Sequence, residues 1–211
     1  MKLQPLVESL PAAMTIILSS NRWEIGRVNS FMASDSEQKI RTARELCEKG
    51  LWSEVLDFAQ NWHAENPTDA KALFYAGVAL AALGRWGEAE KSYHRALKLD
   101  TADFKIWNNL AALLFDELKR PAEGAQCLAQ ALQLDPGNKL GWANLASMNG
   151  QLGRHIQARV CAERALELDP HMVEAHMHRA RAAQMLGQTE IVQAATEELA
   201  KLPPEKFRRT R

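Results

Sequence analysis

Neither sign of charge predominates in this sequence of 211 residues, because 26 lysine and arginine residues balance 26 aspartate and glutamate residues. Proteins that bind nucleic acid or an anionic membrane surface typically carry a basic excess on the binding domain. The balance therefore argues against both kinds of partner. No apolar run approaches the roughly 20 residues that a helix needs to span a bilayer, so the sequence predicts no membrane span.

Cysteine is also scarce. Cys47, Cys127 and Cys161 form an odd set of three without paired spacing. Small secreted domains are typically held by cysteine pairs, whereas unpaired thiols persist in reducing compartments. We therefore expect no disulfide framework and a cytoplasmic location. Cys127 and Cys161 are interpreted as small packing residues rather than as a redox pair.

Catalytic motifs are missing as well. The sequence has no phosphate-binding loop, no quartet of metal ligands and no nucleophile motif. His171, His176 and His178 cluster near the C-terminus, but His176 and His178 are two residues apart on a predicted helix and face different directions. We interpret them as ordinary side chains rather than a metal site. The sequence therefore predicts neither an enzyme nor a cofactor.

The sequence does contain a repeating unit, and residues 70–103 are its clearest copy. Counting Ala70 as position 1, small residues occupy positions 8, 20 and 27, which are Gly77, Ala89 and Ala96. Two antiparallel helices approach closely only where side chains are small, and bulky residues fill the space beside the crossing. Gly84, at position 15, suits a left-handed turn between the helices. The unit is therefore a predicted helix–turn–helix.

Five copies keep this phase, at residues 36–69, 70–103, 104–138, 139–172 and 173–206; we number these repeats one to five. The third has one extra residue, which we place in the turn at residues 118–122, where Pro121 suits the first turn of the next helix. A period of 34 residues with these features is typical of tetratricopeptide repeats. Residues 36–206 therefore resemble the tetratricopeptide repeat family.

The resemblance implies an all-α, right-handed superhelical solenoid with a concave groove. In that family the first helix of each pair lines the groove, mainly through unit positions 2, 5, 9, 12 and 13, and asparagines at position 6 hold a bound peptide in some members. The partner-binding residues that these positions imply are Phe74, Val78, Asn108, Asn109, Ala112, Phe115, Asn144, Ser147, Met177 and Arg181. For Asn109 and Asn144, at position 6, hydrogen bonding between neighbouring helices is an equal alternative.

Two further comparisons with the family are informative. Trp107 and Trp142 fall at position 4, and Trp52 and Trp86 at position 17, all packing positions in the family, so we expect all four in the core.

Chaperone-binding members of the family bind a C-terminal carboxylate with a set of lysines, asparagines and an arginine spread over three consecutive repeats. No three repeats of this sequence supply that set, so such a clamp is not expected.

Residues 1–35 lie outside the repeat period. Their apolar residues follow helical spacing, and Pro11 interrupts them, which predicts two short helices. The segment is open to three interpretations: a secretory signal, with Lys2 as its single early basic residue; an amphipathic segment that caps the first repeat or docks elsewhere; or a leader before a natural start at Met32. Ser34 followed by Glu37 predicts a capping box and a helix that begins there.

The resemblance implies a non-catalytic adaptor that binds a peptide or helix of another protein in its groove. The alternative is a self-assembling or secretion- or complex-assembly scaffold, in which residues 1–35 mediate homo-oligomerisation. The basic tail at residues 207–211 adds nothing to either interpretation.

Overall fold

The computed structural model describes residues 22–202, with side chains from residue 35 onward. Within this part the chain forms α helices and one π-helical turn, and no β strand. The chain divides into two compact units, residues 1–51 and residues 52–211. The predicted all-α fold is confirmed.

The first unit contains helix α2, Arg22–Glu48. The two short helices predicted around Pro11 lie outside the described residues. The prediction that a helix begins after Ser34 is wrong, because α2 runs through this position without a break. Residues 22–33 contain no proline, so no residue of this kind interrupts the helix there. Ala43, at unit position 8, is completely buried.

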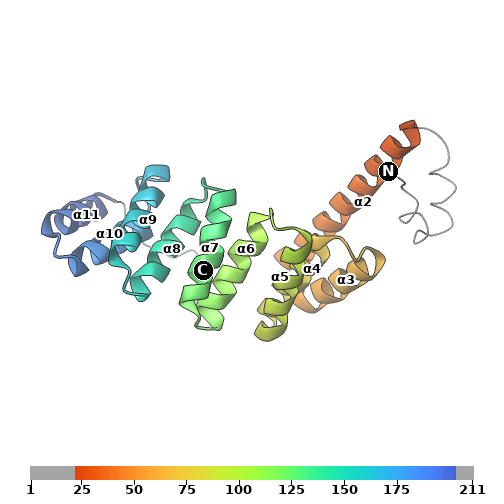
Figure 1. The fold of residues 1–211 in the computed structure, drawn as a ribbon, viewed down its shortest axis with the longest axis horizontal. Coiled ribbons are helices and arrows are strands. Elements are labelled where there is room, and N and C mark those ends of the chain that lie inside the picture. The colour runs from red at the N-terminus through yellow and green to blue at the C-terminus, as the bar shows by residue number, and fades with distance from the viewer. Residues whose placement is uncertain (1–21, 203–211) are drawn as a thin grey trace, which may run out of the picture. The chain divides into compact units, whose positions relative to one another are not determined.

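The second unit consists of helices that lie side by side in chain order (Figure 1). They are α3 (Trp52–Glu65), α4 (Ala70–Ala82), α5 (Trp86–Leu99), α6 (Phe104–Ala112) with the π-helical turn η2 (Leu113–Glu117), α7 (Pro121–Leu134), α8 (Lys139–Gln151), α9 (His155–Leu168), α10 (Val173–Met185) and α11 (Thr189–Lys201). Helices α4, α6, α8 and α10 are the first helices of repeats two to five. Each helix packs against the next, and α8 also contacts α10. The first helices of repeats four and five therefore contact each other as well as the second helix between them.

The crossing of α4 and α5 depends on Gly77. A Cβ atom added there would lie 2.6 Å from Cε1 of Tyr93, whose side chain is 1% exposed. Phe74 packs against the Tyr93 ring and, edge-on, against Tyr75. Ser92 Oγ donates a hydrogen bond of 2.9 Å to the Leu73 carbonyl across the same crossing. The small residue at position 8 therefore admits an aromatic ring, as the pattern predicts.

The turns between paired helices share one design. Residues 83–85, 152–154 and 186–188 each close the turn in three residues, with Gly84, Gly153 and Gly187 at φ values of +74°, +71° and +71°. Glycine adopts this left-handed conformation without a Cβ clash. In repeat three, Lys119 takes the same place at φ +54°. A side chain at this position is strained, since the left-handed region is unfavourable for L-residues.

The extra residue of repeat three lies in the helix, not in the turn where we predicted it. Helix α6 has nine residues and η2 five, one residue more than the 13 of α4, α8 or α10. The backbone absorbs it as a π turn, in which the Leu118 N–H donates 3.0 Å to the Leu113 carbonyl, five residues back. Residues 118–120 then form an ordinary three-residue turn. Pro121 is the first residue of α7, as predicted.

In repeats three and four, a ring nitrogen at unit position 4 bonds the turn before the repeat. Trp107 Nε1 donates 2.9 Å to the Thr101 carbonyl, and Trp142 Nε1 donates 2.9 Å to the Pro136 carbonyl. Both indoles are half-buried and pack against one core cluster. The core assignment is wrong for Trp86, which is 41% exposed, because it is the first residue of α5 and lies at the edge of the helix pair.

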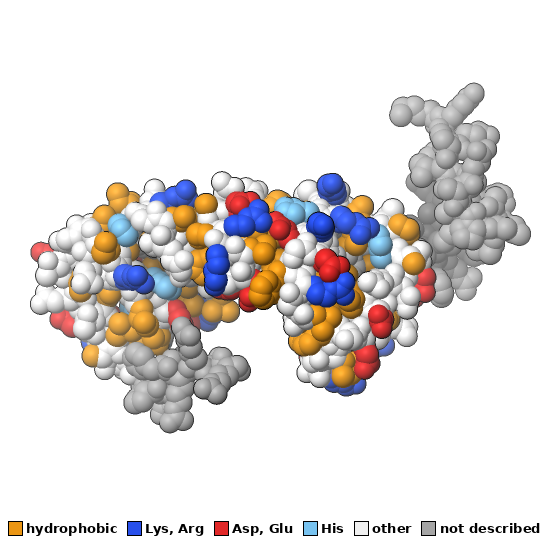
Figure 2. Space-filling view, turned by 90° about the horizontal axis from the view of Figure 1, so that it is seen from below, with side chains coloured by type: hydrophobic (Ala, Val, Ile, Leu, Met, Phe, Trp, Pro, Cys, Tyr) orange, Lys and Arg blue, Asp and Glu red, His pale blue; other side chains and the backbone are white. Residues whose placement is uncertain are grey.

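The surface matches the balanced composition. Figure 2 shows one face on which lysine and arginine side chains are scattered among hydrophobic ones, with no field of a single charge. None of the described helices combines the length and apolarity needed to cross a membrane.

Candidate functional site

Three successive first helices, α6 with η2, α8 and α10, line a common groove of about 350 Å³, which we call the α6–α10 groove. Its lining residues are Asn108, Ala111, Ala112, Phe115, Asp116, Leu128, Leu140, Ala143, Asn144, Ser147, Met148, Met172, Glu174 and His178. Most of them come from one face of each first helix. The repeat therefore places equivalent faces of three helices around one cavity.

Small side chains keep this groove open. Ala112 and Ala143 contribute a methyl group each, and Ser147 a short hydroxyl, so the helices present little bulk here. Phe115 provides the large apolar surface, and it lies in the π turn. Gly124 allows α7 to pack closely against that turn. A Cβ atom on Gly124 would lie 3.0 Å from the Ala111 carbonyl oxygen and 3.4 Å from Phe115 Cβ. The groove thus combines an apolar floor with polar edges, as ligand sites usually do.

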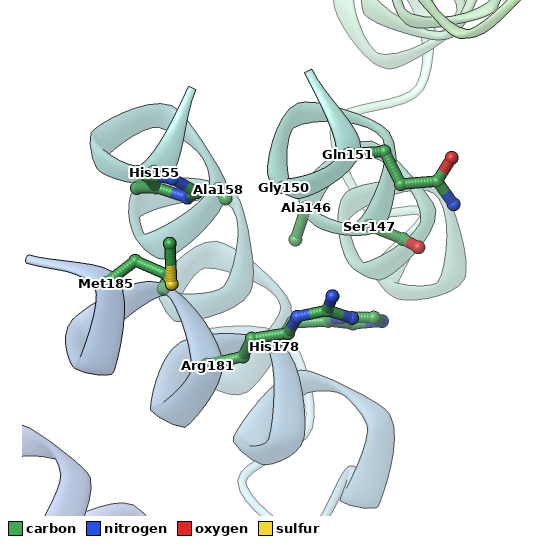
Figure 3. A pocket seen from close by; sticks show the side chains of 10 residues that line it. Ala146, Ser147, Gly150, Gln151, His155, Ala158, His178, Arg181 and Met185 are labelled. Atoms are coloured by element: carbon green, nitrogen blue, oxygen red, sulfur yellow. The ribbon is translucent and has the colours of Figure 1, made fainter. Parts of the chain in front are cut away.

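A second, smaller cavity of about 180 Å³ adjoins the groove, and we call it the α8–α10 cavity. Its lining residues are Ala146, Ser147, Gly150, Gln151, His155, Ala158, His178, Arg181, Ala182 and Met185. Ser147 and His178 line both cavities. Figure 3 shows that Gln151 and Ser147 from α8 point to the same side as His178 and Arg181 from α10.

The two cavities differ in charge. The groove contains Asp116 and Glu174, both acidic, whereas no acidic side chain lines the α8–α10 cavity. Burial, then the positive charge of Arg181, lower the pKa of His178, and Glu174 opposes this effect. His178 is therefore a neutral imidazole at neutral pH, with one N–H to donate.

Family models match residues 70–103, 104–138 and 141–172 as tetratricopeptide repeats. These matches cover α6 and most of α8, whereas α10 lies beyond them. The chain belongs to the tetratricopeptide repeat (TPR) family.

Solved TPR structures share this fold. The crystal structure of MamA is 16% identical, over 75% of this chain and 92% of that chain, with a TM-score of 0.69. MamA 41-end from Desulfovibrio magneticus RS-1 is 17% identical over 82% and 97%, with a TM-score of 0.71. YrrB, described as a TPR protein with an unusual peptide-binding site, is 17% identical over 79% and 86%, with a TM-score of 0.69. At these identities the likeness shows the fold alone.

The structure brings half of the predicted binding residues together. Asn108, Ala112, Phe115, Asn144 and Ser147 line the α6–α10 groove. Arg181 lines the adjoining cavity.

The other predicted binding residues lie elsewhere. Phe74 is only 9% exposed and belongs to the aromatic packing of repeat two, and Val78 is half-buried on the same helix. Met177 is 55% exposed, but neither cavity includes it. Partner binding by any of these residues stays a prediction.

Asn109 does not form the predicted bond to a neighbouring helix, and its role in holding a bound peptide stays a prediction. Its Nδ2 donates 2.8 Å to the Lys105 carbonyl, one turn back on its own helix, rather than to a neighbouring helix. Asn144 is exposed in the groove. Equivalent unit positions in successive repeats therefore do not guarantee equivalent bonding.

Sequence analysis missed several lining residues that its own rule could have found. Leu140 and Glu174 occupy unit position 2, and Asp116 and Gln151 occupy position 13, both of which are groove positions in the family. Their types, one apolar, two acidic and one amide, gave no common chemical signal. His178, at position 6, was interpreted only as an ordinary side chain.

His176, Cys127 and Cys161 have packing roles. His176 is 4% exposed, and its Nε2 bonds the Pro170 carbonyl at 2.9 Å, which repeats the tryptophan bond of position 4. Cys161 belongs to the central core cluster, and Cys127 packs against it. Both are free thiols, and burial raises the pKa of Cys127 to about 11. No group of three potential metal-ligating side chains gathers among the residues that the structure describes.

Proposed function

We propose that this chain is a non-catalytic adaptor that holds a segment of a partner protein in the α6–α10 groove. TPR repeats generally form protein-interaction modules. The observation that carries the proposal is the convergence of α6, α8 and α10 on one open groove of about 350 Å³. An extended or helical segment laid across these helices would contact all three repeats.

The groove chemistry suits a segment of mixed character. Phe115 and Leu140 offer apolar contact, and Leu140 is 60% exposed on the groove wall. The amides of Asn108 and Asn144 each donate and accept, which suits the backbone of a bound peptide. Asp116 and Glu174 add negative charge, which favours a basic or amide side chain of the partner beside them.

A matched pair of substitutions tests the groove. Leu140 and Ile156 are equally exposed, at 60%, but Ile156 lies on α9 outside both cavities. Peptides selected from a random dodecapeptide library on the full-length chain serve as probes, and binding is measured by fluorescence anisotropy. We expect Leu140→Glu to weaken binding about tenfold or more, because a buried contact becomes an unpaired charge. Ile156→Glu should leave binding unchanged.

The control measurements are the circular dichroism spectrum and the melting temperature of both variants, which should match those of the wild type. Equal binding by all three proteins would contradict the groove assignment. The Phe74→Ala change is a poor probe of this surface, since Phe74 is buried and its loss would disturb packing instead.

Self-assembly through the N-terminal segment is the second candidate. It is supported by the division of the chain, in which residues 1–51 form a unit of their own. Light scattering on residues 1–211 and on residues 32–211 tests it, because a docking segment predicts a larger mass for the full chain alone. Monomer masses for both proteins would contradict self-assembly through this segment.

We also propose that the protein is located in the cytoplasm, and cell fractionation tests this.

A further inference from the structure

The α8–α10 cavity is lined by hydrogen-bond donors and lacks an acid to match them. Arg181 carries a permanent positive charge, and Ser147, Gln151 and His178 can each donate a hydrogen bond. All four point to the same side of α8 and α10 (Figure 3). A cavity in which donors from two helices converge is ready to receive an acceptor.

The positive charge is not neutralised within the described part of the chain. Arg181 is exposed and forms no ion pair with an aspartate or glutamate of residues 35–202. Other arginines of this chain are paired, for example Arg159 with Glu163 at 2.5 Å and Arg164 with Glu167 at 2.6 Å. Burial lowers the pKa of His178, and the positive charge of Arg181 lowers it further. The cavity thus presents a cation to solvent.

We propose that the α8–α10 cavity binds a carboxylate of the partner segment, either an aspartate or glutamate side chain or a C-terminal carboxylate. Arginine recognises a carboxylate through two parallel N–H donors, which fixes both position and orientation. Ser147, Gln151 and His178 supply donors for the remaining lone pairs. Met185, which is 62% exposed, and Ala158 provide apolar contact for the methylene groups beside the carboxylate.

The site rests on the proposed function, because it adjoins the groove through Ser147 and His178. It also gives the groove a direction. Asp116 and Glu174 repel a carboxylate from the groove itself, whereas Arg181 attracts one to its end. A bound segment is therefore held with its acidic residue in the α8–α10 cavity and its neutral or basic part in the α6–α10 groove.

A charge reversal tests the site. Random dodecapeptides are selected separately on the full-length wild type, on Arg181→Glu and on Lys98→Glu. Lys98 is an exposed residue of α5 that lines neither cavity, so the last variant makes the same change in net charge elsewhere. We expect aspartate and glutamate to be enriched in peptides from the wild type and from Lys98→Glu. We expect the enrichment to vanish or turn to lysine and arginine with Arg181→Glu.

Two further arms use the best wild-type peptide. Replacing its acidic residue by the corresponding amide identifies a side-chain carboxylate, and amidating its C-terminus identifies a terminal one. One of the two changes should weaken binding to the wild type about tenfold or more, and the same change should have little effect on binding to Arg181→Ala.

The outcomes separate the site from the groove. Peptides that bind the wild type without acidic enrichment, and that lose affinity with Leu140→Glu, overturn the carboxylate site and leave the groove in place. A selection that yields no binding peptide overturns both. Acidic enrichment that persists with Arg181→Glu assigns the carboxylate to other residues and also overturns the proposal.

Discussion

Repeats two and four follow the same spacing of small and large residues but fill their interiors differently. Nine of the 13 residues of α4 are buried, compared with six of the 13 residues of α8. At unit positions 5, 6 and 24, repeat two has Phe74, Tyr75 and Tyr93, and repeat four has Ala143, Asn144 and Ala162. The aromatic rings of repeat two pack on one another. The large residues of repeat two fill its helix crossing, whereas Ala143 and Asn144 of repeat four line the α6–α10 groove.

The strongest test of this comparison is Gly77→Ala. The new Cβ would lie 2.6 Å from the Tyr93 ring, which is buried. We expect the free energy of unfolding to fall by roughly 1–3 kcal/mol, the usual cost of overpacking a core. Urea denaturation followed by circular dichroism measures it.

Gly150→Ala in repeat four is the matched control. No atom lies within 4 Å of the Cβ that this change would add, so nothing opposes it. Alanine favours the helix over glycine, and we expect the free energy of unfolding to rise by about 0.5–1 kcal/mol. If both alanines destabilised the protein equally, the two repeats would not differ in packing as described.

Repeat three offers a smaller effect at its turn. Lys119 occupies a left-handed position that Gly84 and Gly153 fill in the neighbouring repeats. We expect Lys119→Gly to raise the free energy of unfolding by roughly 0.5–1 kcal/mol, because the strain at this residue disappears. The reverse change, Gly84→Lys, should lower it by a similar amount. Chemical denaturation compares the two, and a gain from Gly84→Lys would contradict the assigned backbone.

At acid pH the free energy of unfolding of the second unit should decrease modestly, through His63 near one end and His178 near the other. Burial, followed by Arg95, lowers the pKa of His63, and burial, followed by Arg181, lowers the pKa of His178. In the unfolded chain both histidines titrate near 6.5. As the pH falls through this value, the unfolded chain takes up protons that the folded chain does not, so the free energy of unfolding decreases until the folded pKa values are reached.

The measurement is urea denaturation at pH 7.5, 6.5 and 5.5, and the control is the double variant His63→Gln, His178→Gln. Glutamine cannot titrate but keeps a polar group at each site, including an acceptor for the bond of 2.9 Å between Arg95 and His63. A double variant with the same slope as the wild type would show that other groups control the dependence.

The sequence was sufficient for the helix pairs because their signals are local. Small residues at fixed spacing, Gly84 and Gly153 at the turns, and Pro121 at a helix start each have one dominant structural meaning. The π turn was not predictable in the same way. Counting residues shows that repeat three is one longer, but Lys119 gives no sign that it replaces a turn glycine, and the extra residue was therefore misplaced.

The groove was predictable only in part. Unit positions bring Asn108, Ala112 and Ser147 into the α6–α10 groove, since helical geometry alone places them on one face. They fail for Phe74, because its exposure depends on which rings happen to cover it from Tyr75 and Tyr93. His178 and Arg181 are three residues apart on α10, but their position beside Ser147 depends on the contact between α8 and α10, which no single repeat encodes.

The common turn gives the second helices of repeats two, three and four equivalent starting points. Helices α5, α7 and α9 have 14 residues each, and each follows a three-residue joint with a left-handed centre. The additional residue of repeat three lies in the π turn, before the turn at residues 118–120. Helix α7 therefore begins after a turn of the same length as those before α5 and α9. The length of the turn therefore sets where each second helix begins, independently of the side chains that meet at the crossing of its repeat.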